Sequence, residues 1–184
     1  HIAEAMVRWL APILSFTAEE IWARLPGERA QSVLLDGWYQ IPGAAVPGTA
    51  VDWPLLLKLR EAVARELESL RNAEAIRSGL DAEVRFYCAP ETRERLAPLG
   101  DELRFVFITS EAAVHDAAEA PAEAVPVEGF APGDVSLVVA ATSCEKCARC
   151  WHRRPDVGAD PEHPEICGRC VGNVTGAGET RRYA

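Results

Sequence analysis

The sequence has no long apolar run, and the longest candidate, residues 137–141, is far shorter than the roughly 20 residues that a membrane-spanning helix needs. The amino terminus also lacks the basic stretch followed by an apolar stretch that marks a secretory signal. We therefore expect a cytoplasmic protein without contact to a membrane. The first residue is His1 instead of methionine, which indicates a piece cut from a longer protein.

Basic residues are also scarce, with 19 Lys and Arg against 28 Asp and Glu and a formal net charge of −9. Neutralisation of phosphates by basic side chains supplies most non-specific affinity for nucleic acids, so a general polyanion binder is disfavoured and any such contact has to be local. Hydrophobic residues make up 48% and charged residues 26%, which excludes collagen, a coiled coil and a wholly disordered chain. A length of 184 residues allows one ordinary domain or two small ones.

Two helices are expected before residue 40. Apolar residues recur at helical spacing through residues 2–14, and Pro12 should interrupt that helix. Thr17 with Glu20 matches a capping box at the start of the second helix. The flanking pair at the positions of a hydrophobic staple is Phe16 and Ile21. Residues 33–53, rich in Pro and Gly, are typical of an irregular surface segment.

A long helix is predicted from Asp52, as its cap, to Ser78, with Gly79 at its end. One apolar stripe runs along it, formed by Leu56, Leu59, Val63, Leu67 and Leu70. Its other faces mix basic and acidic residues evenly, so a solvated surface is favoured over a dedicated face for binding nucleic acid.

Beyond Gly79 the apolar period changes to two. Residues 84–88, 103–109 and 135–141 are predicted strands, and residues 91–99 are a short helix, which together give a small α/β unit. Residues 111–134 are rich in Ala and Pro and contain six acidic and no basic residues. We expect a long solvated loop or a partly disordered insert there, in preference to an acidic interaction segment.

Five of the six cysteines lie within 27 residues, which is typical of a metal site in a reducing compartment and not of a disulfide framework. Cys147 and Cys150 form one CxxC pair, 16 residues separate it from the next, and Cys167 and Cys170 form the second. Two such pairs complete the tetrahedral shell of one zinc ion. A closed shell of four thiolates leaves no place for water or substrate, so the zinc is predicted to be structural.

The register of this site has alternatives. Cys144 and Cys147 also form a CxxC pair, and His152 or His163 could replace a cysteine, although four regularly spaced thiols make a histidine ligand less favoured. Spacing alone decides between the two registers only weakly. Where Cys144 is not a ligand it is a spare thiol, and Cys88 is interpreted as a small apolar strand residue.

Charge is distributed unevenly along the chain. Residues 1–143 contain 12 basic and 22 acidic residues, a formal charge of −10, whereas residues 144–184 contain seven basic and six acidic ones. Arg149 and Trp151 flank Cys150 and place a planar cation and a large aromatic ring on one metal-stiffened turn, as base stacking requires. Simple packing of Trp151 explains the same residues equally well, and nearby arginines also offset thiolate charge.

Two distant segments carry a resemblance. Residues 146–152 (KCARCWH), 165–171 (EICGRCV) and the closing RYA resemble the terminal zinc module of the bacterial isoleucyl-tRNA synthetase family, which belongs to the class I aminoacyl-tRNA synthetases. Residues 10–14 (LAPIL) and 16–22 (FTAEEIW) resemble the last helices of the anticodon-binding bundle in the same family. The resemblance covers nearly the whole chain.

The resemblance implies an α+β protein of several parts: the end of an anticodon-binding helical bundle at residues 1–50, a long helix with a small α/β junction domain at 51–142, and a four-cysteine zinc-finger module at 143–184. It implies one structural Zn²⁺ on Cys147, Cys150, Cys167 and Cys170, against Cys144. It favours a role for Arg149 and Trp151 in binding the anticodon region of tRNA(Ile). Weaker candidates for phosphate contacts are Arg153, Arg154, Arg169, Arg181 and Arg182.

The chain contains neither the HIGH-type nor the KMSKS-type signature of class I synthetases, nor an editing domain. By the resemblance, ATP binding and isoleucine attachment belong to a full-length and monomeric ligase, and this chain has no catalytic residue and should be inactive alone. Two other interpretations of the cysteine spacing remain open. One is the zinc finger of a DNA-repair glycosylase, and the other is a free-standing structural zinc ribbon that binds a protein partner.

Overall fold

The computed structural model describes residues 1–40 and 51–183. The chain divides into two compact units, His1–Gly48 and Thr49–Ala184. Of the expected irregular segment at residues 33–53, residues 41–50 lie outside the described residues. Within the described ranges, no helix is both long and apolar enough to cross a bilayer.

The first unit is a small helical body. It contains α1 (Ile2–Leu10), α2 (Ser15–Trp22) and the 3₁₀ helix η1 (Val33–Leu35). The interruption predicted at Pro12 is confirmed, because the chain turns between α1 and α2. Trp22 is buried at the centre, donates its Nε1 hydrogen to the carbonyl of Ala30 over 2.8 Å, and is flanked by the guanidinium groups of Arg8 and Arg29.

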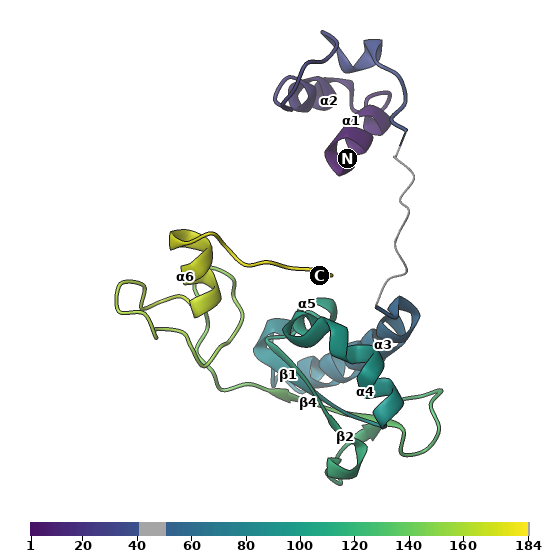
Figure 1. Ribbon diagram of the computed structural model, residues 1–184, viewed down its shortest axis with the longest axis vertical. Helices are drawn as coiled ribbons and strands as arrows, with labels where there is room; N and C mark the ends of the chain where they lie inside the picture. The colour runs from purple at the N-terminus through teal and green to yellow at the C-terminus, as the bar shows by residue number, and fades with distance from the viewer. Residues whose placement is uncertain (41–50, 184) are drawn as a thin grey trace. The chain divides into compact units, whose positions relative to one another are not determined.

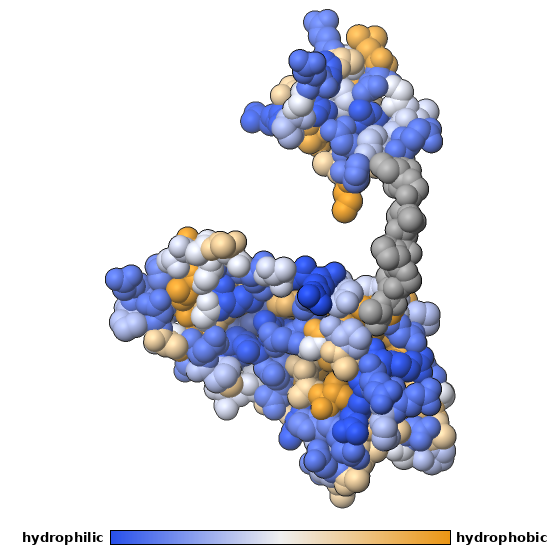
Figure 2. Space-filling view, viewed as in Figure 1, coloured by the Kyte–Doolittle hydropathy of each residue, from blue (hydrophilic) through white to orange (hydrophobic). Residues whose placement is uncertain are grey.

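The predicted start of α2 is wrong. The helix begins at Ser15, so Thr17 already has a helical backbone and cannot act as an N-cap, which must be extended. Phe16 is 88% exposed, so it forms no staple with Ile21. Most large apolar residues of this unit are likewise exposed. They include Ile2, Met6, Ile13 and Leu14. Figure 2 shows a few orange, apolar patches on the visible face of this unit.

The second unit opens with α3 (Trp53–Asn72). The predicted cap is confirmed, because the Asp52 carboxylate accepts a hydrogen bond from the Leu55 amide over 3.0 Å. The predicted stripe is buried along most of its length, from Leu56 to Leu67. The helix ends six residues earlier than predicted, where Glu74 adopts a left-handed backbone with φ 57° and the Ala75 amide bonds back to the Leu70 carbonyl.

Gly79 therefore does not end the long helix. It lies in the 3₁₀ helix η2 (Gly79–Asp81), where a β-carbon would be 2.5 Å from the carbonyl oxygen of Ile108.

We expect Gly79→Ala to destabilise this unit by about 1–3 kcal/mol, because the backbone oxygen cannot move away easily. Urea unfolding would measure the loss. Gly172→Ala is the matched control, since nothing lies within 4 Å of its β-carbon position, and an equal loss in both variants would contradict this explanation.

A four-stranded sheet with the order β2-β1-β4-β3 forms the centre of this unit (Figure 1). The central strand β1 (Ala82–Cys88) is parallel to β2 (Glu111–Asp116) and antiparallel to β4 (Val135–Ala141). Both predicted strands at 84–88 and 135–141 are confirmed. The strand β3 (Val125–Pro126) adds to the free edge of β4.

Helix α3 packs against β4 and against α5 (Leu103–Phe107). Helix α4 (Pro90–Leu96) packs against β1 and β2, and its presence confirms the predicted short helix. The 3₁₀ helix η3 (Ala97–Glu102) joins α4 to α5. One core of apolar side chains from the helices and from β1 and β4 fills the space between them. Phe86 of β1 lies at its centre, with its ring centroid 4.8 Å from that of Phe107.

One prediction for this unit is wrong, and another holds only in part. Residues 103–109, predicted as a strand, form α5, since a short apolar run that is buried on all sides fits either element. Residues 111–134 are a solvated loop only in part, because most of residues 118–134 are exposed whereas residues 111–116 are half-buried. This stretch contains β2, the 3₁₀ helix η4 (Ala117–Glu119) and β3, and Val127 is buried in the core. The unit is thus a mixed α/β structure with a small sheet and a four-cysteine cluster after β4.

Candidate metal centre and nucleic-acid interface

Two tight turns after β4 present the four clustered cysteines. In the first turn, Lys146 pairs with Arg153 across an antiparallel bridge, and the Cys147 amide bonds to the His152 carbonyl over 2.9 Å. The second turn leads into α6 (Gly168–Thr175), whose N-cap residue is Cys167. These local bonds hold each CxxC pair in a fixed conformation.

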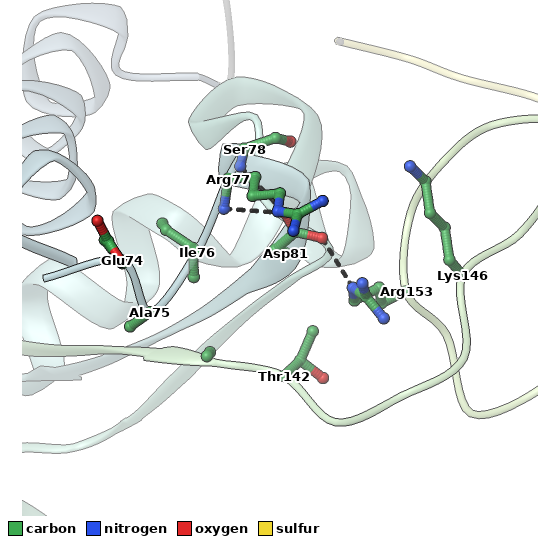
Figure 3. A pocket seen from close by; sticks show the side chains of 10 residues that line it. Glu74, Ala75, Ile76, Arg77, Ser78, Asp81, Thr142, Lys146 and Arg153 are labelled. Atoms are coloured by element: carbon green, nitrogen blue, oxygen red, sulfur yellow. Dashed lines mark hydrogen bonds and ion pairs between the residues drawn. The ribbon is translucent and has the colours of Figure 1, made fainter. Parts of the chain in front are cut away.

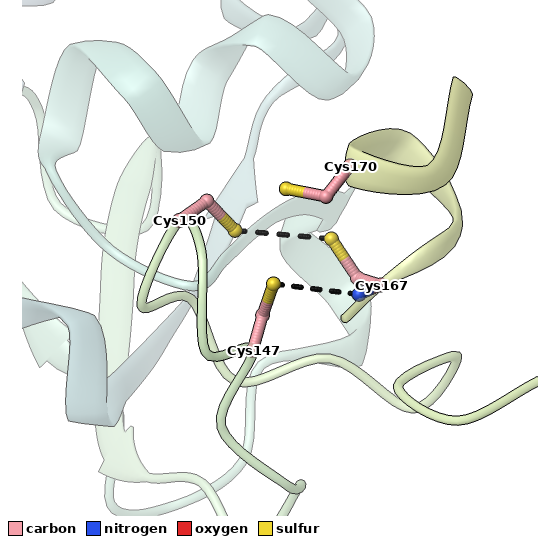
Figure 4. A group of neighbouring side chains, drawn as sticks. All are labelled: Cys147, Cys150, Cys167 and Cys170. Carbon is pink, nitrogen blue, oxygen red and sulfur yellow. Dashed lines mark hydrogen bonds between the residues drawn. The ribbon is translucent and has the colours of Figure 1, made fainter. Parts of the chain in front are cut away.

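The sulfur atoms of Cys147, Cys150, Cys167 and Cys170 all lie within 4.8 Å of one another (Figure 4). The Cys150 and Cys167 sulfurs are 3.8 Å apart. A tetrahedral zinc site with bonds of about 2.3 Å requires sulfur separations of about 3.8 Å, so the arrangement fits zinc. Among the described residues, this metal-binding group contains neither Cys144 nor a histidine.

The environment of the thiols differs from one to the next. Burial opposes ionisation of Cys147, but backbone amide hydrogen bonds from residues such as Cys150 and Cys167 outweigh it and lower its pKa. Burial raises the pKa of both Cys167 and Cys170. Arg149 donates a hydrogen bond to the Cys170 sulfur over 3.7 Å. The charge of a bound metal ion would offset the cost of ionising the buried thiols.

Trp151 stands out from the metal-binding turn. Its backbone has a positive φ of 69°, which is uncommon for a large side chain, and its side chain is 62% exposed. The Lys146 ammonium lies 5.4 Å from the centre of its ring. The ring therefore offers a large surface on which a base can stack.

Most of the other candidate arginines bind carboxylates of the chain itself. Arg153 is paired with Asp81 over 2.8 Å, and Arg154 is paired with Glu111. Arg169 and Arg181 both contact Glu179 and both lie over the ring of Phe105. The backbone amide of Arg182 bonds to Glu102. The structure brings these arginines to the junction between the metal-binding turns and the sheet, and not into one cationic surface.

Sequence reasoning missed the central position of Phe105. Its half-buried ring contacts two of these arginines, and His152 approaches it edge-on at 5.6 Å between ring centroids. Burial, as the largest cause, lowers the pKa of His152, so this ring is neutral near neutral pH. No local signal marks this position, because Arg169, Arg181 and His152 are 47 or more residues away in the sequence. Lys146, whose ammonium group lies near the Trp151 ring, was likewise not predicted as a site residue.

Comparison with known proteins agrees with this geometry. Residues 145–172 match the family described as a zinc finger found in FPG and IleRS, and residues 1–86 match the anticodon-binding domain of tRNA ligase. The zinc finger alone is shared with FPG proteins, but the second match is not. Together they define the class: part of a tRNA ligase with an anticodon-binding segment and a structural zinc finger.

Individual relatives narrow the class. The chain is 55% identical over 186 residues to an isoleucine–tRNA ligase of Halorhodospira halophila and 56% identical over 191 residues to one of Thioalkalivibrio sulfidiphilus. A third, from Azotobacter vinelandii, is 54% identical over 187 residues. Each comparison covers all of this chain and 20% of the relative, so the chain spans about a fifth of their length. The chain belongs to the isoleucine–tRNA ligase family and corresponds to a C-terminal region of such a ligase.

Proposed function

We propose that this region binds the anticodon part of tRNA(Ile) within a monomeric cytoplasmic ligase that attaches isoleucine to that tRNA with ATP. The observation that carries the proposal is the exposed ring of Trp151 on a turn that a metal can stiffen. The region takes no part in bond formation. It holds the anticodon and thereby orients the distant acceptor end of the tRNA for the reaction.

For the metal, we propose Cys147, Cys150, Cys167 and Cys170 as the four ligands of one zinc ion. When bound, zinc supplies a cross-link between the two turns. The division into residues 1–50, 51–142 and 143–184 is proposed as the functional organisation.

The arginines are proposed to have two different tasks. Arg149 lies beside both Trp151 and the Cys170 sulfur, so it can steady the turn and reach a base. Because Arg153, Arg154 and Arg169 already have carboxylate partners, we assign them mainly to holding the zinc module on the sheet. Arg182 remains a candidate for a phosphate contact, and so does Arg181, which pairs with Glu179 but lies in the exposed segment after α6.

Trp151→Ala is expected to weaken binding of cognate tRNA to the full-length ligase by about 1–3 kcal/mol, the usual value of one base–aromatic stack. Zinc content should not change, because the side chain contributes no ligand. Filter binding would measure the affinity, and Trp151→Phe, which keeps an aromatic face, should retain part of it. Unchanged affinity in Trp151→Ala would contradict the stacking assignment.

A comparison of three probes tests the function itself. The ligase should bind cognate tRNA more tightly than non-cognate tRNA and both more tightly than duplex DNA. Preference for duplex DNA would instead favour the glycosylase interpretation of the zinc finger. Absence of any nucleic-acid binding would favour a zinc module with a protein partner.

A further inference from the structure

A cleft of about 430 Å³ lies beside the metal-binding turns and has no role in the function proposed above. The segment that follows α3, together with Asp81, forms one wall, and Lys146 and Arg153 of the zinc module form the facing wall (Figure 3). The complete lining is Glu74, Ala75, Ile76, Arg77, Ser78, Asp81, Ala141, Thr142, Lys146 and Arg153.

Only some of the charged side chains in the cleft have a partner of opposite charge among the described residues. The Asp81 carboxylate accepts hydrogen bonds from Arg153 over 2.8 Å and from the Arg77 and Ser78 amides over 3.2 and 3.0 Å. The bond from Arg153 is the largest influence that holds the pKa of Asp81 below its usual range. Arg153 and Asp81 thus neutralise each other. Glu74, the other acidic residue of the lining, forms no ion pair with a cation of the cleft among the described residues.

Arg77 and Lys146 are the two cations of the cleft lining that are not neutralised by an acidic side chain. Neither has a carboxylate within ion-pair distance in the described part of the chain, and both are exposed at the cleft. Most arginines near the zinc module do have such partners. With only the Glu74 carboxylate to oppose them, these two cations give the cleft an excess of positive charge in a chain whose formal charge is −9.

Hydroxyl groups add donors to the same cleft. The Ser78 oxygen accepts a hydrogen bond from the Leu80 amide, and the Thr142 oxygen accepts one from the Cys144 amide. Neither hydroxyl donates to another group within residues 1–40 and 51–183, so each can donate its hydrogen to a ligand. Cations and donors without acceptors of their own are what phosphate oxygens require.

Lys146 connects the cleft to the aromatic surface next to it. Its ammonium group lines the cleft and also lies 5.4 Å from the centre of the Trp151 ring. An RNA base that is stacked on an aromatic side chain is unpaired, and its phosphates continue along the protein surface beside it. The edge of the cleft is where such a phosphate would fall.

We propose that this cleft binds the phosphodiester backbone of single-stranded RNA next to the base stacked on Trp151, with Lys146 and Arg77 contacting phosphate oxygens. The inference rests on the proposed function, because it takes the RNA to be the tRNA that Trp151 meets. It adds Lys146 and Arg77 to the residues that we propose to contact the tRNA, and it adds the cleft as the place where the RNA backbone runs.

The test measures tRNA affinity of the full-length ligase over a range of salt concentrations. Lys146→Gln and Arg77→Gln should each weaken binding several-fold at low salt and reduce the slope of log affinity against log salt by about 0.7–0.9, the value for one phosphate contact. Arg60→Gln is the matched control, since Arg60 is exposed on α3 and also has no carboxylate partner among the described residues. It should leave the slope unchanged. Glu74→Gln should tighten binding, because it removes the opposing charge.

The outcomes separate this inference from the proposed function. If the two cleft variants show the same slope as Arg60→Gln while Trp151→Ala still weakens binding, the cleft proposal is overturned and the anticodon role stands. If Trp151→Ala has no effect, the proposed function and the place of the RNA beside Trp151 both fail. Binding of inorganic phosphate alone in a Lys146-dependent way, with unchanged tRNA slopes, would show a free-anion site and would also overturn the proposal.

Discussion

Replacing Cys170 with serine is expected to abolish zinc binding and unfold the segment from Cys144 to Tyr183. Three of the four clustered thiols are buried, and the cluster around them contains little other apolar material. Folding of such a module depends on the metal, whose apparent binding free energy in zinc fingers is about 10–16 kcal/mol near neutral pH. Elemental analysis and limited proteolysis of residues 144–183 would measure both losses. Binding of tRNA should fall as well, because Trp151 loses its support.

Cys144→Ser is the control for this prediction. It removes a thiol that is close in sequence but outside the cluster, so zinc content and protease resistance should remain those of the unchanged protein. Loss of zinc in Cys144→Ser with retention in Cys150→Ser would contradict the assignment and favour the shifted register, in which Cys144 and Cys147 form the first pair. The part of the second unit that contains the sheet, residues 51–142, should still show its own unfolding transition in Cys170→Ser, because its core contains none of the four clustered thiols.

Leu59→Ala is expected to remove about 2–5 kcal/mol from the free energy of unfolding of the second unit, as deletion of a buried leucine usually does. The Leu59 side chain is 0% exposed and lies on the face of α3 that packs into the core beneath the sheet. Neither neighbouring helix nor strand can close the cavity without losing its own packing. Urea unfolding followed by circular dichroism would give the value.

Leu57→Ala on the same helix is the comparison. Leu57 is 57% exposed, so the same chemical change should cost less than about 0.5 kcal/mol. Similar losses in both variants would mean that α3 does not pack through the stripe described here. Zinc content should be the same in both, which separates loss of the core from loss of the metal centre.

Local sequence patterns predicted those parts of the fold that local forces determine. The Asp52 cap, the stripe from Leu56 to Leu67 and the alternation in β1 and β4 each depend on neighbours in the sequence, and each was found. The end of α3 was missed, because Glu74 adopts there a left-handed backbone that glycine usually supplies.

Elements that depend on distant partners were not predictable in this way. β2 is a half-buried strand of mixed composition, and it exists because its backbone pairs with β1, which is 28 residues earlier. The run at 103–107 is apolar enough for a strand, but it is helical and packs against α3. In the candidate site, the spacing of the cysteines predicted the cluster, whereas the contacts of Arg153 and Phe105 depend on how the turns meet the sheet.

The last residues of the described chain return from α6 to the sheet domain. The backbone amides of Arg182 and Tyr183 both bond to the Glu102 carboxylate, and Tyr183 packs against the main core. The segment after β4 that carries the cysteines is therefore fixed at both of its ends, by the covalent link to β4 and by these two bonds, in addition to the ion pairs of Arg153 and Arg154. A segment fixed in this way has little freedom to rotate against the sheet. The direction in which Trp151 faces thus depends on the bonds to Glu102 as well as on the turn that carries the ring, and we expect a substitution at Glu102 to weaken the proposed contact with RNA.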